Sequence, residues 1–104
     1  MSPDWNDLSN IDRLIHEPAR LIIIATLYAV ESADFLYLQG ETGLTKGNLS
    51  SHLSKLEAGE YVEIEKTYQG KIPLTICRLT EAGRKAFEAY RLHMRQFVEK
   101  TTPE

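Results

Sequence analysis

Apolar residues in the first third of the chain recur at the spacing of helices rather than of strands. A short helix is predicted from Ile11 to Ile15, and it stops near Pro18, because the residue before a proline is pushed out of helical geometry. Pro18 suits the first turn of a second helix that runs to about Val30. This helix is expected to be the most buried, through a broad apolar face: Leu21, Ile22, Ala25, Leu27 and Tyr28.

The next two helices are predicted mainly from their caps. Ser32 or Asp34 can cap one of them, since a short side-chain oxygen accepts the first free amide hydrogens. Its expected buried side is Phe35, Leu36 and Leu38, and Gly40 to Gly43 are expected to form the turn after it. Thr45 is the expected N-cap of the following helix, which ends at Gly59, a glycine of the C′ type. Its apolar residues form one narrow stripe: Leu49, Leu53 and Leu56.

After Gly59 the period changes from helix to strand. Residues 61–67 alternate, with Val62 and Ile64 on the buried side. Residues 68–71 are the expected hairpin tip, where Gly70 can take positive φ, and residues 72–79 return as the second strand. Pro73 cannot donate to a ladder, so we expect it near the tip or on an outer edge. Thr80 caps a last long helix that reaches about Lys100, which makes the fold mainly α with a β-hairpin (α+β).

The order of these elements predicts a winged helix-turn-helix. In that motif the second helix enters the major groove, so it needs one apolar edge to pack and one polar edge left free. Around the predicted helix 45–58, Gly47, Ser51 and Ser54 point away from the leucine stripe. The candidate DNA-contacting residues of this helix are Thr45, Lys46, Gly47, Asn48, Ser50, Ser51, His52 and Lys55.

The candidate residues of this helix have distinct expected roles. Asn48 can pair with adenine, and the serines can meet bases or phosphates. Lys46 and Lys55 are placed to meet phosphates, whereas His52 lies nearer the packed side and could face either way. The competing interpretation is an ordinary amphipathic helix with a solvated face. The absence of any acidic residue between Lys46 and Lys55 favours DNA.

The hairpin tip carries cationic and hydrogen-bonding side chains. A solvated turn would explain such a tip, but so would contact with the DNA backbone beside the major groove. The candidate wing residues are Lys66, Thr67, Tyr68, Gln69 and Lys71.

Three segments resemble small winged-helix regulators of the MarR and ArsR type. Residues 44–57 (LTKGNLSSHLSKLE) are similar to their recognition helix, residues 58–66 (AGEYVEIEK) to the join between that helix and the wing, and residues 78–84 (RLTEAGR) to the start of their last helix. The resemblance covers roughly residues 18–100. It implies a dimer on a partly palindromic operator, with the wing on the adjacent backbone or minor groove, and it places Lys46, Gly47, Asn48, Ser51 and Lys55 at DNA-reading positions. The chain departs from many relatives in having no arginine on this face, which weakens the expectation of direct guanine readout.

The last predicted helix suggests a dimer. Its apolar residues follow the three- and four-residue spacing of a coiled-coil seam: Phe87, Tyr90, Met94 and Phe97. Packing against a twin helix would hide these side chains, although they could instead fold back on the chain's own first full helix. Both can hold, and N-terminal residues such as Trp5 and Leu8 could join the interface.

Length and charge set the bounds of this interpretation. The 104 residues fit one winged-helix domain, with an N-terminal extension (1–17), a core (18–79) and a C-terminal helix (80–100). The net charge of −3 argues against nucleic acid at first sight. However, residues 1–43 hold seven acidic and two basic residues, whereas residues 44–79 and 80–104 each carry a net charge of +1.

Other classes of function lack sequence support. No apolar run is long enough for a membrane span, and the N-terminus does not look like a secretory signal. Cys77 is the only cysteine, so a reducing cytoplasm is the expected compartment. Cys77 with His16, His52 and His93 matches no metal-ligand spacing, and we expect no metal or cofactor. Phosphate loops, nucleophile elbows and paired-carboxylate motifs are missing, so we do not expect an enzyme.

The sequence therefore predicts a homodimeric, sequence-specific regulator of transcription that binds double-stranded DNA and acts as a repressor. The alternative is a winged-helix module that binds protein and not DNA. The acidic total charge and the missing arginines favour that alternative modestly.

Overall fold

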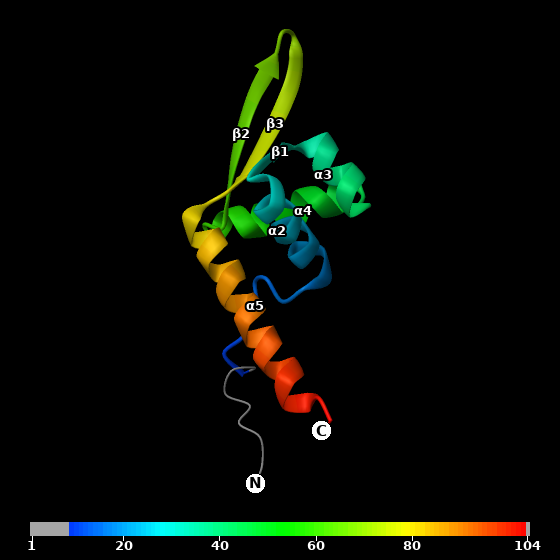
Figure 1. The fold of residues 1–104 in the computed structure, drawn as a ribbon. Coiled ribbons are helices and arrows are strands. Elements are labelled where there is room, and N and C mark those ends of the chain that lie inside the picture. The colour runs from blue at the N-terminus through cyan, green and yellow to red at the C-terminus, as the bar shows by residue number, and fades with distance from the viewer. Residues whose placement is uncertain (1–8, 104) are drawn as a thin grey trace.

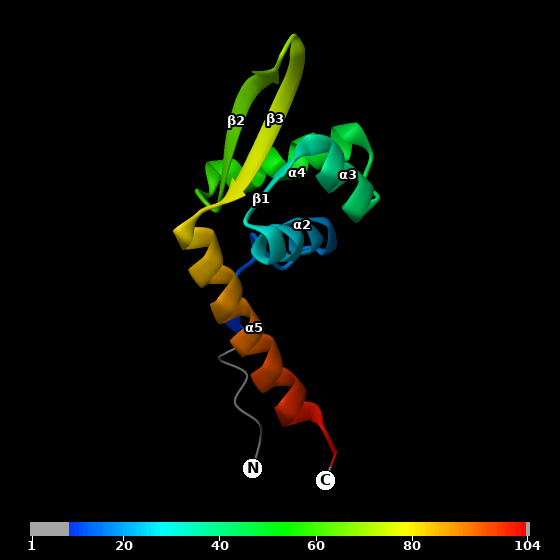
Figure 2. The same ribbon diagram turned by 45° about the horizontal axis from the view of Figure 1, so that its top comes forward.

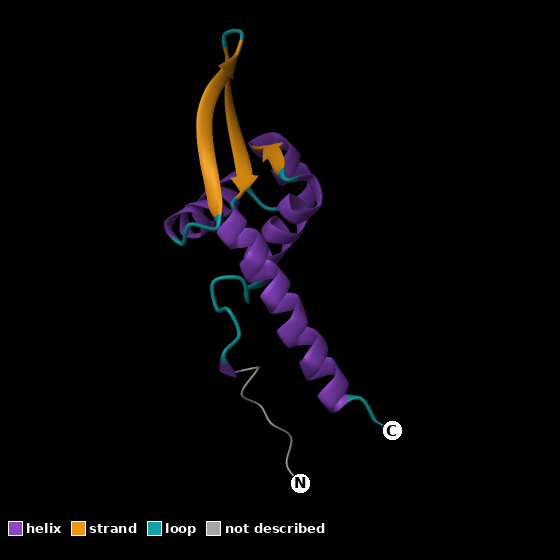
Figure 3. Ribbon diagram, turned by 60° about the vertical axis from the view of Figure 1, so that its left-hand side comes forward, coloured by secondary structure: helices purple, strands orange, loops and turns teal. Residues whose placement is uncertain are grey.

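The computed structural model describes residues 9–103, which form a helical body with two projections (Figure 1). A β-hairpin leaves the body in one direction and the last helix leaves it in the opposite direction, as Figure 3 also shows. The principal extents of 63 × 24 × 21 Å reflect this shape. The predicted α+β fold, mainly α with a β-hairpin wing, is confirmed. Trp5 and Leu8 fall outside the described residues.

The predicted helix at residues 11–15 is wrong, because the chain makes only one turn there. The Asp12 Oδ1 atom accepts hydrogen bonds from the amides of Leu14 (2.9 Å) and Ile15 (3.1 Å), as an N-cap does, but the turn ends before Pro18 because Glu17 is extended. The hydroxyl of Tyr61 donates to the other carboxylate oxygen of Asp12. This turn fixes the N-terminal segment against the body and buries Ile15 completely.

Helix α2 (Pro18–Val30) has the predicted bounds, but only part of its predicted buried face is confirmed: Leu27 is buried and Leu21 and Tyr28 pack against the core, whereas Ile22 and Ala25 are exposed. The Glu17 carboxylate caps it by accepting from the amides of Ala19 and Arg20. Its fully buried residues are Ile23, Ile24 and Leu27, whereas Ile22 is 43% exposed. The run of four apolar residues from Leu21 to Ile24 is compatible with several rotations of the helix, and only packing chooses among them.

The chain then forms strand β1 (Ser32–Asp34), which the sequence analysis missed, and helix α3 (Phe35–Thr42). Asp34 is the N-cap of α3, with its Oδ1 atom 2.8 Å from the Tyr37 amide. Helix α3 continues through the predicted turn as far as Gly43, whose φ of 71° ends it. Leu38 is buried as predicted, but Leu36 is 76% exposed, so its assignment to the core was wrong.

Helix α4 (Lys46–Ala58) begins at the predicted N-cap, Thr45, and ends at Gly59. The left-handed residue at this end is Glu60 (φ 66°), whereas Gly59 itself has a φ of −81°. Gly59 is needed for another reason, because a Cβ atom there would lie 2.3 Å from the Leu14 Cδ2 atom. The N-terminal turn therefore packs directly against the end of α4.

Strands β2 (Val62–Gln69) and β3 (Ile72–Leu79) form the hairpin, and β1 joins on the other side of β3 in the order β1-β3-β2 (Figures 1 and 2). The tip is tighter than predicted, since only Gly70 and Lys71 lie between the strands and Gly70 has a φ of 64°. Strand β1 pairs only with Ile76–Arg78. Pro73 therefore lies in the outer, two-stranded part of the hairpin, near the tip as predicted.

Helix α5 (Glu81–Thr101) begins at the predicted N-cap Thr80, whose Oγ1 atom accepts from the Gly83 amide. Gly83 is buried so closely that a Cβ atom would lie 2.3 Å from the Tyr61 carbonyl oxygen. One core joins all these elements, and its buried apolar members are Ile15, Ile23, Ile24, Leu27, Leu38, Leu49, Leu53, Leu56, Val62, Cys77, Phe87 and Tyr90.

Candidate nucleic-acid interface

Helix α4 separates its apolar and polar residues completely. Leu49 and Leu56 are fully buried and Leu53 is 2% exposed, so the stripe that the sequence predicts is sealed against the body. At the start of the helix the Thr45 Oγ1 atom accepts a hydrogen bond from the Asn48 amide at 3.2 Å. The exposed residues before the last three positions of the helix, which we call the polar face of α4, are Lys46, Gly47, Asn48, Ser50, Ser51, Ser54 and Lys55; the exposed Glu57 and Ala58 follow at its C-terminal end.

The polar face is cationic and consists mostly of small side chains. It carries Lys46 and Lys55 and no acidic residue between them. Within residues 9–103, the hydrogen bonds and ion pairs involve neither lysine side chain, so both can reach an external partner. A Cβ atom on Gly47 would meet nothing within 4 Å, which leaves open space above the first turn. A polyanion could approach this part of the helix backbone closely.

His52 does not belong to the polar face. Its Nδ1 atom lies 3.3 Å from the Arg20 guanidinium and 3.5 Å from the Glu17 carboxylate, both at the start of α2. The Nε atom of Arg20 also donates to the Leu14 carbonyl oxygen at 2.5 Å. The sequence analysis grouped His52 with the DNA-contacting residues but left its direction open. The structure turns it toward the body.

Glu17 completes this cluster as an ionised carboxylate. Partial burial acts to raise its pKa, but hydrogen bonds from the Arg20 and Ala19 amides, with His52 and Arg20 nearby, outweigh that effect and lower the pKa below its ordinary value. The charged carboxylate therefore caps α2 and also faces the imidazole of α4. These contacts fix α4 relative to α2, and so fix the direction of the polar face.

The hairpin presents the predicted wing residues well away from the body (Figure 2). Lys66, Gln69 and Lys71 are exposed, Tyr68 is 69% exposed, and Thr67 is half-buried within the hairpin. The described strand pairing holds Thr67 opposite Leu74 and Lys66 opposite Thr75. The tip is therefore ordered by its ladder and still free to contact a partner.

A groove of about 490 Å³ lies between α3, α4 and the hairpin. On the α4 side it is lined by Lys46, Ser50 and Ser54. Its other lining residues come from α3 and the hairpin, and they include Phe35, Leu36, Lys66, Pro73 and Leu74. The sequence analysis missed this groove, because its walls come from three segments that only the fold brings together.

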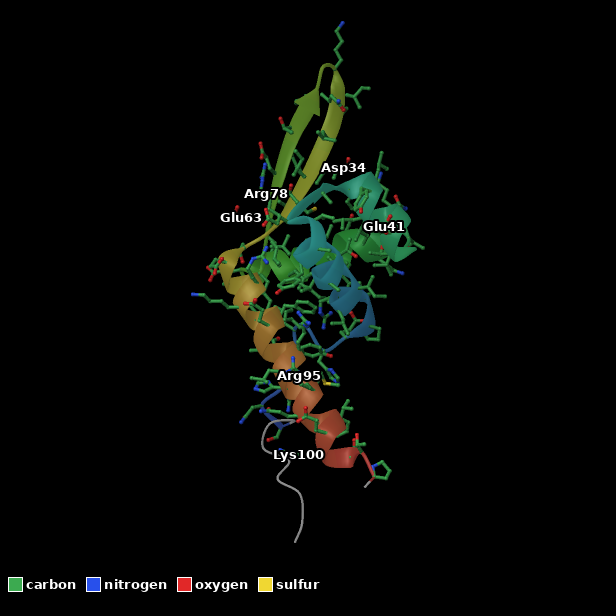
Figure 4. The ribbon with its side chains drawn as sticks, viewed as in Figure 1. Asp34, Glu41, Glu63, Arg78, Arg95 and Lys100 are labelled. Carbon is green, nitrogen blue, oxygen red and sulfur yellow. The ribbon has the colours of Figure 1, made fainter. Side chains whose placement is uncertain are left out.

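Acidic residues gather on a different side of the hairpin. A second groove, of about 570 Å³, is lined by Glu57, Glu60, Glu63 and Glu65. Arg78 crosses from β3 and pairs with Glu65 at 2.8 Å, near the labelled Glu63 (Figure 4). None of these glutamates lines the groove beside Lys46, where the acidic lining residue is Asp34, the N-cap of α3.

The predicted dimer seam divides into two parts, and the first part is already buried by residues of the same subunit. Phe87 is 7% exposed and Tyr90 is 6% exposed within a single subunit. Phe87 packs on Tyr28 of α2 with ring centroids 5.0 Å apart, and the Tyr90 hydroxyl lies 3.0 Å from the His16 Nδ1 atom. Burial raises the pKa of Tyr90. These two residues thus fold back on their own chain, which was the alternative to a role in the dimer.

The second part of the seam lies where α5 projects beyond the body. Met94 and Phe97 are half-buried, and Val98, one turn after Met94, is 55% exposed. The same segment carries Arg95 and Lys100, which Figure 4 places far from α3 and the hairpin. Met94 still packs against the core, so Val98 is the seam-side residue whose apolar side chain is mostly exposed on the far half of α5.

The described residues also bear on thiol reactivity, metal binding and membrane insertion. Burial raises the pKa of the Cys77 thiol to about 11, with Glu57 and Asp34 adding to the effect, so this cysteine is held as a neutral thiol. Within residues 9–103, no group of three or more His, Cys, Asp and Glu side chains could hold a metal ion. In the same part of the chain no helix is both long enough and apolar enough to cross a membrane.

Comparison with known proteins agrees with this geometry. Residues 19–98 match the family described as "Winged helix DNA-binding domain". An uncharacterized protein of Methanocaldococcus jannaschii is 39% identical over 79 residues, which are 75% of this chain and 85% of the relative. A transcriptional regulator homologue from Pyrococcus horikoshii superposes with a TM-score of 0.84 at 26% identity, covering 89% of this chain and 94% of the other. A MarR family regulator from Silicibacter pomeroyi has a TM-score of 0.66 at 24% identity, covering 94% of this chain and 68% of the other.

Proposed function

We propose, since the chain belongs to the winged helix DNA-binding domain family, that it is a homodimeric transcriptional repressor that binds specific sites in double-stranded DNA. The family and the fold support a DNA-binding regulator of transcription. The homodimer, the sequence specificity and the repression are our additions. We place its action in the cytoplasm, where a bacterial or archaeal regulator meets its DNA.

The observation that carries this proposal is the polar face of α4. Its leucines are sealed while its serines, asparagine and lysines are exposed, so one side of the helix is left for a polar partner. An α-helix fits the major groove of B-DNA, where residues near its N-terminus reach base edges. Asn48 and Ser51 lie in the first two turns, and Gly47 lets the helix approach closely.

The lysines supply the sequence-independent part of binding. Lys46 and Lys55 stand at opposite ends of α4 and would meet phosphates on either side of the groove. Lys66, Gln69 and Lys71 would carry the hairpin to the neighbouring backbone or minor groove. Thr67 and Tyr68 add hydrogen-bonding groups along the same edge.

The far half of α5 supports the homodimer. The exposed Val98, with the half-buried Met94 and Phe97 beside it, would be covered by the same surface of a second copy. Phe87 and Tyr90 would then act indirectly, by fixing the angle at which α5 leaves the body. Two copies related by two-fold symmetry read a partly palindromic site when their recognition helices are about 34 Å apart. In this proposal, occupation of such a site at a promoter represses transcription.

DNA binding is tested by fluorescence anisotropy with a duplex from the chain's own promoter region. Because lysine–phosphate contacts release counterions, affinity should fall steeply with salt. Lys46→Ala and Lys55→Ala should weaken binding to every duplex and lower the slope of log K against log salt by about 1 each. Lys85→Ala, on α5 and away from the polar face, is the matched control and should leave the slope unchanged. If no duplex bound at low salt, the proposal would be wrong.

A protein-binding module is the second candidate, and the acidic groove at the base of the hairpin favours it. Glu57, Glu60, Glu63 and Glu65 would suit a basic partner. The same titration separates the two functions, because a protein-binding module would show no salt-dependent binding to DNA.

A further inference from the structure

The polar face of α4 offers a restricted set of groups to DNA, and this restriction suggests which bases it reads. We infer that α4 reads A·T base pairs, so that each operator half-site is A·T-rich where the helix enters the major groove, with Asn48 as the main specificity-determining residue. This inference rests on the proposed DNA-binding function and adds the class of sequence recognised.

The first argument is the position of the arginines. Guanine is most often read by a bidentate arginine or lysine, and arginine has the geometry that fits best. The chain has no arginine between Arg20 and Arg78, a stretch that contains all of α4 and the hairpin tip. Both flanking arginines are engaged within the fold, Arg20 with Leu14 and His52 and Arg78 with Glu65. The remaining arginines lie at Arg13, Arg84, Arg91 and Arg95, outside these elements.

The lysines of α4 do not replace the missing arginines. Lys46 is the first residue of the helix and lines the groove toward the hairpin, and Lys55 lies in the last turn. Between them the exposed positions hold only glycine, asparagine and serine. After Lys46, the first two turns of the helix therefore lack a cation that could pair with the O6 and N7 acceptors of guanine.

The second argument is Asn48 itself. It is exposed in the first turn of α4, and its backbone amide is already satisfied by Thr45. Within residues 9–103 the hydrogen bonds leave its side-chain amide unused. That amide presents one donor and one acceptor side by side, which complement N7 and N6 of adenine. Ser51 lies one turn after Asn48 on the same side of the helix. Its side chain is small and does not obstruct such a contact.

The third argument is the apolar wall of the groove beside α4. Ser50 and Ser54 line this groove from the helix, and Leu36, Pro73 and Leu74 line it from α3 and β3. Leu36 is 76% exposed, so its side chain is available for contact at this groove. The thymine methyl group is the apolar group that a base pair offers in the major groove. If a DNA strand runs along this groove, the methyl group of a thymine would contact the apolar wall. Cytosine has no such methyl group, so this contact would be lost where cytosine replaces thymine.

The test is a selection from random duplexes with the full-length chain, followed by anisotropy on one selected duplex and on its counterpart with A·T pairs changed to G·C. We expect the selected half-sites to be A·T-rich and the wild-type chain to prefer the selected duplex. Asn48→Ala should reduce that preference by about tenfold. Asn48→Arg should shift the preferred base at one position toward guanine. Lys55→Ala is the control, because it should weaken both duplexes equally.

The outcomes separate this inference from the function on which it rests. Selected sites with a conserved G·C core, or an Asn48→Ala variant that keeps the full preference, would overturn A·T readout while leaving DNA binding intact. Failure of the wild-type chain to bind any duplex would overturn the proposed function as well. Both asparagine variants alter an exposed side chain, and their folding is checked by circular dichroism.

Discussion

Helices α4 and α5 are both amphipathic, yet a single subunit fully buries the apolar stripe of only one of them. The stripe of α4 is wholly buried, from Leu49 to Leu56. The stripe of α5 is buried at Phe87 and Tyr90, but it continues past the body to Val98, which is 55% exposed. What remains exposed is therefore polar on α4 and partly apolar on α5.

The difference shows that the two helices need different partners. Small polar and cationic groups are well hydrated when exposed, so their exposure costs little free energy. They also complement a polyanion such as DNA. Exposed apolar surface is unfavourable in water, and it is best covered by a similar surface. The angle between these two surfaces is set by contacts of α2. On one side Glu17 and Arg20 meet His52, and on the other Tyr28 meets Phe87.

The largest effect is expected inside the buried stripe of α4. Leu53→Ala should lower the free energy of unfolding by about 2–5 kcal/mol, because it removes buried methyl groups and leaves a cavity. Chemical denaturation of the purified protein measures this change. Ser54→Ala, the exposed neighbour, should stay within about 0.5 kcal/mol of the wild type. Equal stability of all three proteins would contradict the sealed stripe.

A somewhat smaller effect is expected where α5 leaves the body. Gly83→Ala places a Cβ atom 2.3 Å from the Tyr61 carbonyl oxygen, so the start of α5 must shift. We expect a loss of about 1–3 kcal/mol in thermal or chemical unfolding. Gly47→Ala is the matched change in open space. It should be neutral or stabilising by up to about 1 kcal/mol, because alanine is the better helix former. A destabilised Gly47→Ala with an unaffected Gly83→Ala would reverse this expectation.

The contrast between the two helices can be sharpened on α5 alone. Val98→Asp should raise the dissociation constant of the dimer about tenfold or more, since it places a charge in the apolar surface proposed as the interface. Sedimentation equilibrium measures the constant. Leu92→Asp is the control, because Leu92 is 49% exposed and lies about 120° round the helix from Val98. Equal dimerisation of wild type and Val98→Asp would place the interface elsewhere.

The smallest effect concerns the bond that holds the N-terminal turn against the end of α4. Burial raises the pKa of Tyr61 from 10.0 to about 12, with the hydrogen bond to Asp12 and its charge adding to the shift. Because the folded pKa lies above the unfolded value, this stabilisation is fully present below about pH 10 and is lost as the pH rises through about 12. Urea unfolding of wild type and Tyr61→Phe at pH 8 and pH 11 should therefore show a difference that narrows at pH 11. A constant difference would mean that the phenol does not titrate differently in the folded state.

Much of the helical framework was predictable, because its signals are local. Thr45, Asp34 and Thr80 each cap the helix expected of them, since a cap is formed within four residues of chain. The leucine stripe of α4 was also clear, because a single narrow stripe allows only one packed orientation. Helix α2 shows the opposite case, where the ends were predicted correctly but the continuous apolar residues left the buried face only partly correct.

The candidate site was predicted unevenly for the same reason. The polar face of α4 follows from the position of the leucines, so its members could be named in advance. His52 lies at the boundary of that face, and its direction depends on Glu17 and Arg20, more than 30 positions earlier. The groove beside α4 could not be predicted, because Leu36, Ser54 and Leu74 meet only in the folded chain.

The sequence by itself determined where α2, α4, α5 and the hairpin form and which side of α4 is polar, since these follow from caps, periodicity and turn residues close together along the chain. The tertiary structure alone decided the pairing of β1 with β3, the direction of His52 and the burial of Phe87 and Tyr90 within one subunit. Each of these depends on contacts between distant segments, and such contacts form only when the competing ways of burying the same apolar surface have been resolved by packing.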